Sequence, residues 1–313
     1  MGKRILTAIC YVLVIASFFA LKIFVNDYLF DVLILLMGSV AAFEGARIFA
    51  KAGLSNEIIA STAFPSLLFL SNFLCIYYKI DLWIALLIDI ALVLFATLVM
   101  FLINLMLKQT KKEIEIKNLE ISKAKYSFKK AMGNMVSFIY PSLFFMIMMF
   151  LNHFDSLNLK VQGFNGLLSI ICLISVFLIP IFTDTFAMLT GMLIGGKKLC
   201  PKLSPKKTIS GAVGGTLWCV LLCACVYLVL NATSTFNYAF KSGGLAIWMF
   251  LLIVLFGSII AQFGDLFESF LKRRANIKDS GKILPGHGGM LDRIDSYIFV
   301  VPYLMLAFCL VLI

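Results

Sequence analysis

Apolar runs of about twenty residues recur along this 313-residue chain and leave few folds open to it. A helix of that length crosses the roughly 30 Å hydrocarbon core of a bilayer. Only 14% of the residues are charged, against about 25% in a soluble domain. The sequence also lacks the alternation of polar and apolar residues that is typical of an outer-membrane barrel. It therefore predicts an all-α, polytopic integral membrane protein.

Hydropathy divides the chain into about nine transmembrane helices. They are expected at residues 5–24, 29–45, 57–77, 82–107, 132–151, 164–195, 209–230, 244–270 and 296–313. The sixth segment is too long for one straight span and contains Pro180, which should kink or break a helix. Two alternatives stay open: two helical pieces, or one helix that leaves the membrane at Asp184.

The distribution of Lys and Arg predicts the orientation. If the N-terminus is cytoplasmic, 23 of the 27 Lys and Arg residues fall in cytoplasmic segments, as the positive-inside rule requires. The expected localisation is a bacterial-type cell membrane, with the protein multi-pass and its active site facing the cytoplasm. The net charge of +11 gathers on that face, where it attracts anionic headgroups or nucleotides and needs no nucleic acid to explain it.

The chain is expected to form one integrated membrane domain with two regions. Residues 1–131 hold N-terminal transmembrane helices and a basic cytoplasmic helix at 108–131, and residues 132–313 hold the catalytic region. The basic helix is rich in Lys and Glu. It is interpreted either as a solvated linker or as a surface helix resting on anionic lipid.

A dense polar cluster between Ser269 and Asp295 interrupts the apolar pattern. Charged groups are costly near a bilayer and persist there mainly when they serve chemistry or transport. Asp265 precedes the cluster, and Asp292 and Asp295 begin the last span. Carboxylate ligands without Cys or paired His favour Mg²⁺ or a similar hard cation. Neighbouring Lys and Arg indicate phosphate ligands, so the sequence predicts a site for metal and phosphate.

Two upstream segments are expected on the same face. Asp184 follows Pro180 in an apolar run, and Ser204-Pro-Lys-Lys-Thr208 precedes a helix that begins with several glycines. A loop before such a helix can present backbone N–H groups and lysine to a phosphate. Glycines in the downstream cluster, Gly288 and Gly289 among them, allow the backbone to approach a ligand closely.

The segment from Ser269 to Asp295 resembles the signature of phosphatidate cytidylyltransferases, also called CDP-diacylglycerol synthases. That pattern is a Ser, then Lys-Arg, then Lys-Asp after four residues, then His-Gly-Gly, then Asp-Arg-x-Asp, and every position is filled here. Asp184 and Ser204-Pro-x-Lys-Thr-x-x-Gly are similar to family elements further upstream. Over the first 130 residues the resemblance is general, in hydropathy alone.

The resemblance implies that CTP and phosphatidate give CDP-diacylglycerol and pyrophosphate, in phospholipid biosynthesis. It implies Mg²⁺ held by Asp265 and Asp292, room for a second cation such as K⁺, and a homodimer. Catalytic roles fall on Asp265, Lys272, Arg273, Lys278, Asp279, His287, Asp292, Arg293 and Asp295. Substrate binding falls on Asp184, Ser204, Lys207, Thr208, Ser269, Gly288 and Gly289. The expected partners are CTP, phosphatidate and the lipid bilayer.

Two other functions use similar residues. A CTP-dependent lipid kinase of the polyprenol type also needs basic loops and acidic metal ligands, but it transfers the γ-phosphoryl group. A non-enzymatic ion-coupled transporter would place its carboxylates at the midplane of the membrane, whereas these aspartates cluster towards one face. The labelled products of CTP separate all three functions.

Overall fold

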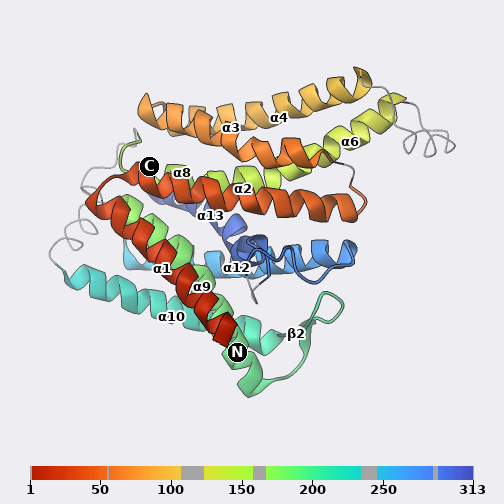
Figure 1. The fold of residues 1–313 in the computed structure, drawn as a ribbon. Coiled ribbons are helices and arrows are strands. Elements are labelled where there is room, and N and C mark those ends of the chain that lie inside the picture. Colours follow the sequence, from red (N-terminus) through yellow and green to blue (C-terminus); the bar gives the residue numbers. More distant parts are fainter. Residues whose placement is uncertain are drawn as a thin grey trace.

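The protein is a bundle of long helices (Figure 1). The structure is a computed structural model, and it describes residues 2–54, 56–106, 123–157, 167–233, 245–284 and 288–312. The long helices are α1 (Gly2–Phe24), α2 (Asp27–Lys51), α3 (Ile58–Tyr77), α4 (Leu82–Met106), α6 (Lys123–Ser137), α9 (Leu168–Ile194), α10 (Ile209–Ala232), α12 (Ile247–Arg274) and α13 (Leu291–Leu312). Three short helical pieces continue α6: the π-helix η1 (Phe138–Leu143), α7 (Phe144–Met146) and α8 (Met148–Asn152).

Eight helical segments in the described ranges are long and apolar enough to cross a membrane, the path from Ala124 to Asn152 counting as one. Helix α1 adds 23 further residues of apolar helix. The prediction of an all-α polytopic membrane protein is confirmed, while the count of nine spans and the cytoplasmic N-terminus stay predictions. The sixth segment is a single helix, since α9 runs through Pro180 without a break.

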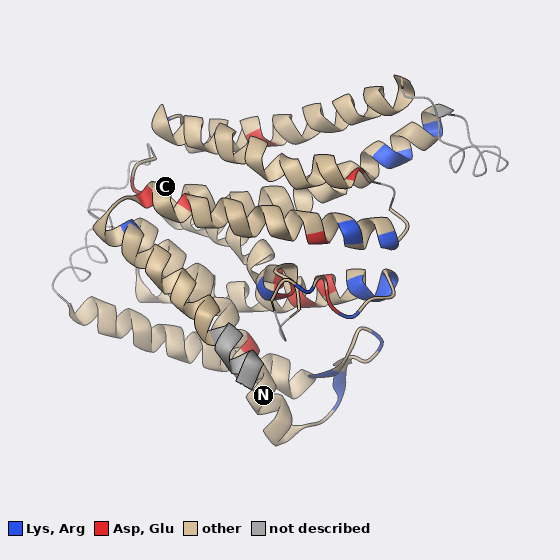
Figure 2. Cartoon of the chain, in the orientation of Figure 1, with Lys and Arg blue, Asp and Glu red and all other residues tan. Residues whose placement is uncertain are grey.

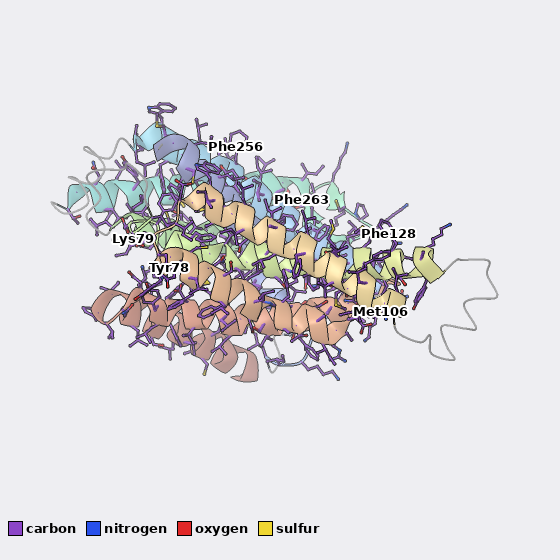
Figure 3. The ribbon with its side chains drawn as sticks, turned by 90° about the horizontal axis from the view of Figure 1, so that it is seen from above. Tyr78, Lys79, Met106, Phe128, Phe256 and Phe263 are labelled. Carbon is purple, nitrogen blue, oxygen red and sulfur yellow. The ribbon has the colours of Figure 1, made fainter. Side chains whose placement is uncertain are left out.

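Apolar side chains turn outwards from the rim of the bundle, as expected for helices in contact with lipid. Helix α4 packs mainly against α6 and α3, and it crosses the face of the bundle that is turned to the viewer in Figure 3. Phe128, Phe256 and Phe263 are each more than half exposed. A soluble protein rarely exposes so much contiguous apolar surface, so this rim fits a bilayer.

The core lies where α2, the η1–α8 path and α13 meet. Phe30, Met146, Phe150, Leu304 and Phe308 are fully buried there. Helix α2 begins at Asn26, whose side chain accepts a hydrogen bond from the Tyr28 backbone N–H at 2.9 Å, as a helix N-cap should. Because α2 also packs on α12 and α13, residues of the N-terminal region reach the catalytic region. The division at residue 131 stays a prediction.

Helices α9 and α10 pack closely through small residues. A Cβ atom on Gly215 would lie 2.7 Å from the Cβ of Ala187, and one on Gly211 would lie 2.6 Å from the Ala187 carbonyl oxygen. Small residues allow such close approach between membrane helices. The glycines after Thr208 therefore bring α10 against α9, which fixes where Asp184 lies.

Most of the described Lys and Arg residues lie at one end of the bundle (Figure 2). They belong to the C-terminal ends of α2 and α12, the start of α6 and the segment between α9 and α10. The C-terminus lies at the other end (Figure 1). The described basic segments that the sequence assigns to one side of the membrane are thus together at one end.

Candidate active site

A cavity of about 840 Å³ opens at the basic end of the bundle. It is lined by residues of α9, α10, α12 and α13 and by a small two-stranded sheet. Its described wall contains five aspartates and five cationic side chains: Asp184, Asp265, Asp279, Asp292, Asp295, Lys198, Lys206, Lys207, Lys272 and Arg293. Residues more than a hundred positions apart in the sequence thus meet in one polar site.

The small sheet carries three of the lysines. Strands β1 (Lys198–Cys200) and β2 (Ser204–Thr208) pair antiparallel. The sequence placed Ser204–Thr208 in a loop, and that interpretation is wrong. The strand forms because β1 and β2 pair across a short turn, after Gly195 and Gly196 reverse the chain with positive φ angles of 65° and 101°.

Strand β2 delivers Lys207 to α12 and ends by capping α10. The Lys207 ammonium donates to Asp265 Oδ2 in a close ion pair. The Thr208 hydroxyl oxygen accepts a hydrogen bond from the Gly211 backbone N–H at 3.0 Å. The threonine therefore works as the N-cap of α10, while the lysine faces the cavity.

Asp292 is the most firmly held carboxylate of the wall. Its Oδ2 atom accepts hydrogen bonds from the backbone N–H groups of Ser280 and Gly289 at 2.9 and 2.8 Å. Its Oδ1 atom accepts one from Lys272 Nζ at 2.8 Å. Asp292 also lies in the first turn of α13, where the helix dipole favours a negative charge. Charge-assisted hydrogen bonds of this kind fix the side chain before any ligand arrives.

Asp184, Asp265 and Asp295 form a second acidic group, close enough for their charges to interact. The Ser296 hydroxyl donates to Asp184 Oδ2 at 3.4 Å, and the Ser296 backbone N–H donates to Asp295 Oδ1 at 2.7 Å. Neighbouring negative charges raise each other's free energy unless a cation lies between them. The ion pair between Lys207 and Asp265 places one positive charge beside this group.

The donor set fits a hard cation that arrives with phosphate. Within the described ranges, no three Asp, Glu, His or Cys side chains are arranged so that they could hold a metal ion together. Mg²⁺ is usually held by one or two carboxylates together with water and substrate phosphates. Asp265 and Asp292 both line the cavity, so each is available as one of those carboxylates.

Nine of the residues predicted from the sequence line the cavity: Asp184, Lys207, Thr208, Asp265, Lys272, Asp279, Asp292, Arg293 and Asp295. Six other described ones lie outside its wall: Ser204, Ser269, Arg273, Lys278, Gly288 and Gly289. Ser269 donates to Asp265 at 3.4 Å, and Arg273 donates to the Leu203 carbonyl oxygen at 3.4 Å. Ser269 thus contacts a residue of the wall, and Arg273 contacts the turn between β1 and β2. His287 lies outside the described residues.

Two buried glutamates of the site were not among the predicted residues. Glu268 pairs with Lys272, which also bonds Asp292, so two carboxylates share one ammonium group. Glu44, on α2, accepts hydrogen bonds from the far end of the sequence. In the sequence, Glu44 and Glu268 each stand inside an apolar run, and a carboxylate is rare inside a membrane helix.

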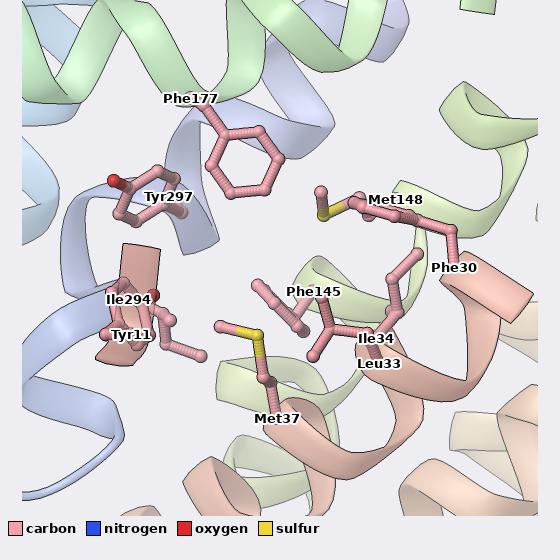
Figure 4. A pocket seen from close by; sticks show the side chains of 10 residues that line it. All are labelled: Tyr11, Phe30, Leu33, Ile34, Met37, Phe145, Met148, Phe177, Ile294 and Tyr297. Atoms are coloured by element: carbon pink, nitrogen blue, oxygen red, sulfur yellow. The ribbon is translucent and has the colours of Figure 1, made fainter. Parts of the chain in front are cut away.

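A smaller cavity of about 250 Å³ lies on the other side of the same wall. It shares Asp184, Asp292, Arg293 and Asp295 with the large cavity, and its other lining is mainly apolar: Tyr11, Val12, Ile181, Thr185, Leu284 and Tyr297. Tyr11 and Tyr297 also line an enclosed apolar void of about 10 Å³, which Figure 4 shows between α1, α2, α9 and α13. Apolar surface thus continues from the charged wall into the bundle.

These features define a helical, multi-pass membrane protein with a charged site at one end of the bundle, between a polar and a mainly apolar cavity. Within that class, the chain belongs to the cytidylyltransferase family, whose model matches residues 3–311. The family resemblance drawn from the sequence is confirmed.

Several relatives are named phosphatidate cytidylyltransferase. Those of Staphylococcus saprophyticus subsp. saprophyticus and Staphylococcus aureus (strain COL) are each 39% identical over 184 residues, which is 59% of this chain and 61% of the relative. That of Staphylococcus epidermidis is 47% identical over 128 residues, 41% of this chain and 45% of the relative. The similarity therefore spans about three fifths of the length of the first two relatives.

Proposed function

We propose that this protein transfers the cytidylyl group of CTP to phosphatidate, which gives CDP-diacylglycerol and pyrophosphate. The observation that carries the proposal is the wall of four charged side chains between two unlike cavities. A polar substrate in the large cavity and an amphipathic one in the small cavity would meet at that wall. The names of the staphylococcal relatives support the same reaction.

The large cavity suits a nucleoside triphosphate. Its volume of about 840 Å³ falls within the usual range of roughly 300–1,000 Å³ for ligand sites. Lys198, Lys206 and Lys207 of the small sheet line it, and ammonium groups pair well with phosphate oxygens. We assign CTP to this cavity, with its phosphates between the sheet and α12.

The small cavity suits the lipid headgroup. Val12 and Ile181 on its rim are 62% and 46% exposed, on helices with apolar outer faces. Arg293 lies on the shared wall, and a guanidinium can bind a phosphate through two parallel hydrogen bonds. We assign the phosphate of phosphatidate to the side of the wall near Arg293, with its acyl chains towards Val12 and Ile181.

The chemistry needs positioning and charge neutralisation more than a strong base. The lipid phosphate is already an anion, so one of its oxygens can attack the α-phosphorus of CTP directly. A new P–O bond forms there, the bond to the β-phosphate breaks, and pyrophosphate leaves with the electron pair. Lys207 and Lys272 neutralise the phosphates. A Mg²⁺ ion held by Asp265 and Asp292 would supply Lewis-acid stabilisation of the developing charge.

The proposed setting is the cell membrane, with the cavities facing the cytoplasm and the protein acting as a homodimer. The basic end of the bundle supports this orientation, because Lys and Arg favour the cytoplasmic side of membrane proteins. CTP would then reach the large cavity from water, while the lipid would reach the small cavity from the bilayer.

Labelled CTP tests the reaction. The purified protein in detergent–phosphatidate micelles with Mg²⁺ should move label from the α-phosphorus into lipid and release the γ-label as pyrophosphate. A γ-label in the lipid would identify a CTP-dependent lipid kinase instead. No turnover of either label by folded protein would reject both enzymes and favour the ion-coupled transporter.

A further inference from the structure

We propose that Glu44 of α2 is a positioning residue, which fixes the loop between α12 and α13 and thereby sets the place of Asp292. Residues 275–284 and 288–290 of that loop are described. Glu44 lies on α2, more than 220 positions before the signature segment that begins at Ser269. Its effect on the reaction rests on the proposed function, whereas its hold on the loop does not.

The contacts of Glu44 span almost the whole sequence. Its carboxylate Oε2 accepts a hydrogen bond from the Ser280 hydroxyl at 2.9 Å and another from the Leu291 backbone N–H at 2.9 Å. Ser280 lies in the loop before α13, and Leu291 is the first residue of α13. One oxygen atom from α2 thus joins the two ends of the segment that surrounds Asp292.

The same segment holds Asp292. The backbone N–H groups of Ser280 and Gly289 donate to Asp292 Oδ2, and the Asp292 backbone N–H donates to the Ser280 hydroxyl oxygen at 3.3 Å. Ser280 therefore contacts Glu44 and Asp292 at once. If Glu44 releases the Ser280 hydroxyl and the start of α13, both anchors of Asp292 Oδ2 are free to move.

Two glycines make room for this side chain. A Cβ atom on Gly281 would overlap the Glu44 carboxylate, and a Cβ on Gly289 would overlap both that carboxylate and the Ser280 hydroxyl. Glu44 is only 1% exposed, so its insertion between the two glycines is complete. The glycine-rich turn, which the sequence suggested for contact with a ligand, is packed here around a glutamate.

The contacts of Glu44 with Ser280 and Leu291 require a hydrogen-bond acceptor at this position. Both hydrogen bonds end on Oε2, and Oε1 has no hydrogen-bond partner among the described residues. A glutamine has the same shape, and its amide oxygen can accept both bonds. Glu44→Gln should therefore keep the loop in place, while Glu44→Ala removes the acceptor and leaves a void.

The effect on catalysis should appear in kcat. A displacement of about 1 Å in a catalytic group can cost roughly a hundredfold in rate. Glu44 is not among the residues that line either cavity, so the KM values for both substrates should change little. Ser280→Ala removes one of the two bonds and should give a smaller loss of kcat.

Asp31 offers a matched control on the same helix. It is also fully buried, and it accepts hydrogen bonds from Asn152 at 2.8 Å and pairs with His153 at 2.7 Å, at the other end of α2. Asp31→Ala removes a buried, hydrogen-bonded carboxylate from α2 without touching the loop. Loss of general stability should affect both variants alike.

Hydrogen–deuterium exchange of peptides from 278–292 measures the loop without any substrate. We expect exchange there to accelerate about tenfold or more in Glu44→Ala and to stay as in the wild type in Glu44→Gln and Asp31→Ala. In steady-state assays, kcat should fall about a hundredfold in Glu44→Ala and recover in Glu44→Gln. The double variant with Ser280→Ala should lose no more than Glu44→Ala alone.

Unchanged exchange in Glu44→Ala would overturn the proposal, as would an equal change in Asp31→Ala. A Glu44→Gln variant as inactive as Glu44→Ala, or a loss confined to KM, would also overturn the positioning role. If Glu44→Ala does not fold, hydrogen–deuterium exchange and kcat are measured in Ser280→Ala and Glu44→Gln instead, and these two variants test the proposal. An inactive wild-type protein would reject the proposed function instead, and the exchange comparison would still decide whether Glu44 holds the loop.

Discussion

Lys207→Ala is the substitution that best separates a nucleotide site from a merely basic membrane face. It removes an ammonium group that pairs with Asp265 on the cavity wall. The Lys207 side chain is 29% exposed and that of Asp265 is 25% exposed, so water screens this pair only in part. We expect Lys207→Ala to raise the KM for CTP and to lower kcat, because a phosphate contact is lost and Asp265 is left without its counter-charge.

The size of the effect follows from this partial burial. Truncating one member of a fully buried charge pair costs about 2–5 kcal/mol, and an exposed pair is worth about 0–1 kcal/mol. For a side chain that is mostly shielded, about 2–3 kcal/mol is reasonable, or roughly 30- to 150-fold in kcat/KM.

The assay measures initial rates against CTP concentration in detergent–phosphatidate mixed micelles. Lys129→Ala is the control, because Lys129 is an exposed lysine of α6 at the same basic end. Its loss should change kcat/KM less than about twofold. Equal, mild effects of both substitutions would refute the reasoning and reduce the β1–β2 segment to a basic strip beside the membrane.

Three further outcomes are expected. Asp265→Asn and Asp292→Asn should each lower turnover about a thousandfold or more while the melting temperature in detergent stays near the wild type; near-normal activity would remove that residue from the mechanism. Gly215→Leu should destabilise the protein by about 1–3 kcal/mol, since the new leucine side chain would clash with α9. Cys225→Leu, on the exposed side of α10, should not destabilise it. The melting temperatures of the two variants test this difference. A single cysteine at Lys202, in a cysteine-free background, should react with an impermeant thiol reagent only from the cytoplasm; labelling from outside would contradict the orientation.

Helix positions were predictable because hydropathy and length decide them. The expected spans 57–77, 82–107 and 209–230 agree with α3, α4 and α10 to within two residues at each end. The expected span 244–270 ends four residues before α12 does, because α12 continues past the apolar run to Arg274. Hydropathy marks where a helix leaves the hydrocarbon, and the backbone stays helical beyond that point.

The strand at Ser204–Thr208 was not predictable from local pattern. It contains Pro205 and two lysines, which are poor strand formers, and it forms by pairing with Lys198–Cys200. The packing role of the α10 glycines was not predictable for a similar reason. Their missing side chains face α9, and helix packing of that kind cannot be read from composition.

The charged lining of the large cavity was largely predictable, and the buried residues behind it were not. Most of the predicted aspartates and lysines stand in polar segments, where the sequence concentrates charge; Asp184, in an apolar run, is the exception. Glu44 stands in an apolar run, and its partners Ser280 and Leu291 are more than 230 positions away. Such a residue becomes interpretable only when the fold brings α2 beside the start of α13.

The arrangement of charges suggests why the wall carries lysines and aspartates in pairs. Its described residues contain five of each sign, so their formal charges cancel before a substrate binds. Lys207 pairs with Asp265, and Lys272 with Asp292. Unpaired charges at this depth would carry a large desolvation cost, so the pairs keep the site stable in the absence of substrate. A phosphate that binds Lys207 or Lys272 leaves the paired aspartate with an uncompensated negative charge. The site then favours a cation most strongly when the nucleotide is present, which agrees with the finding that no three described Asp, Glu, His or Cys side chains are placed to hold a metal ion.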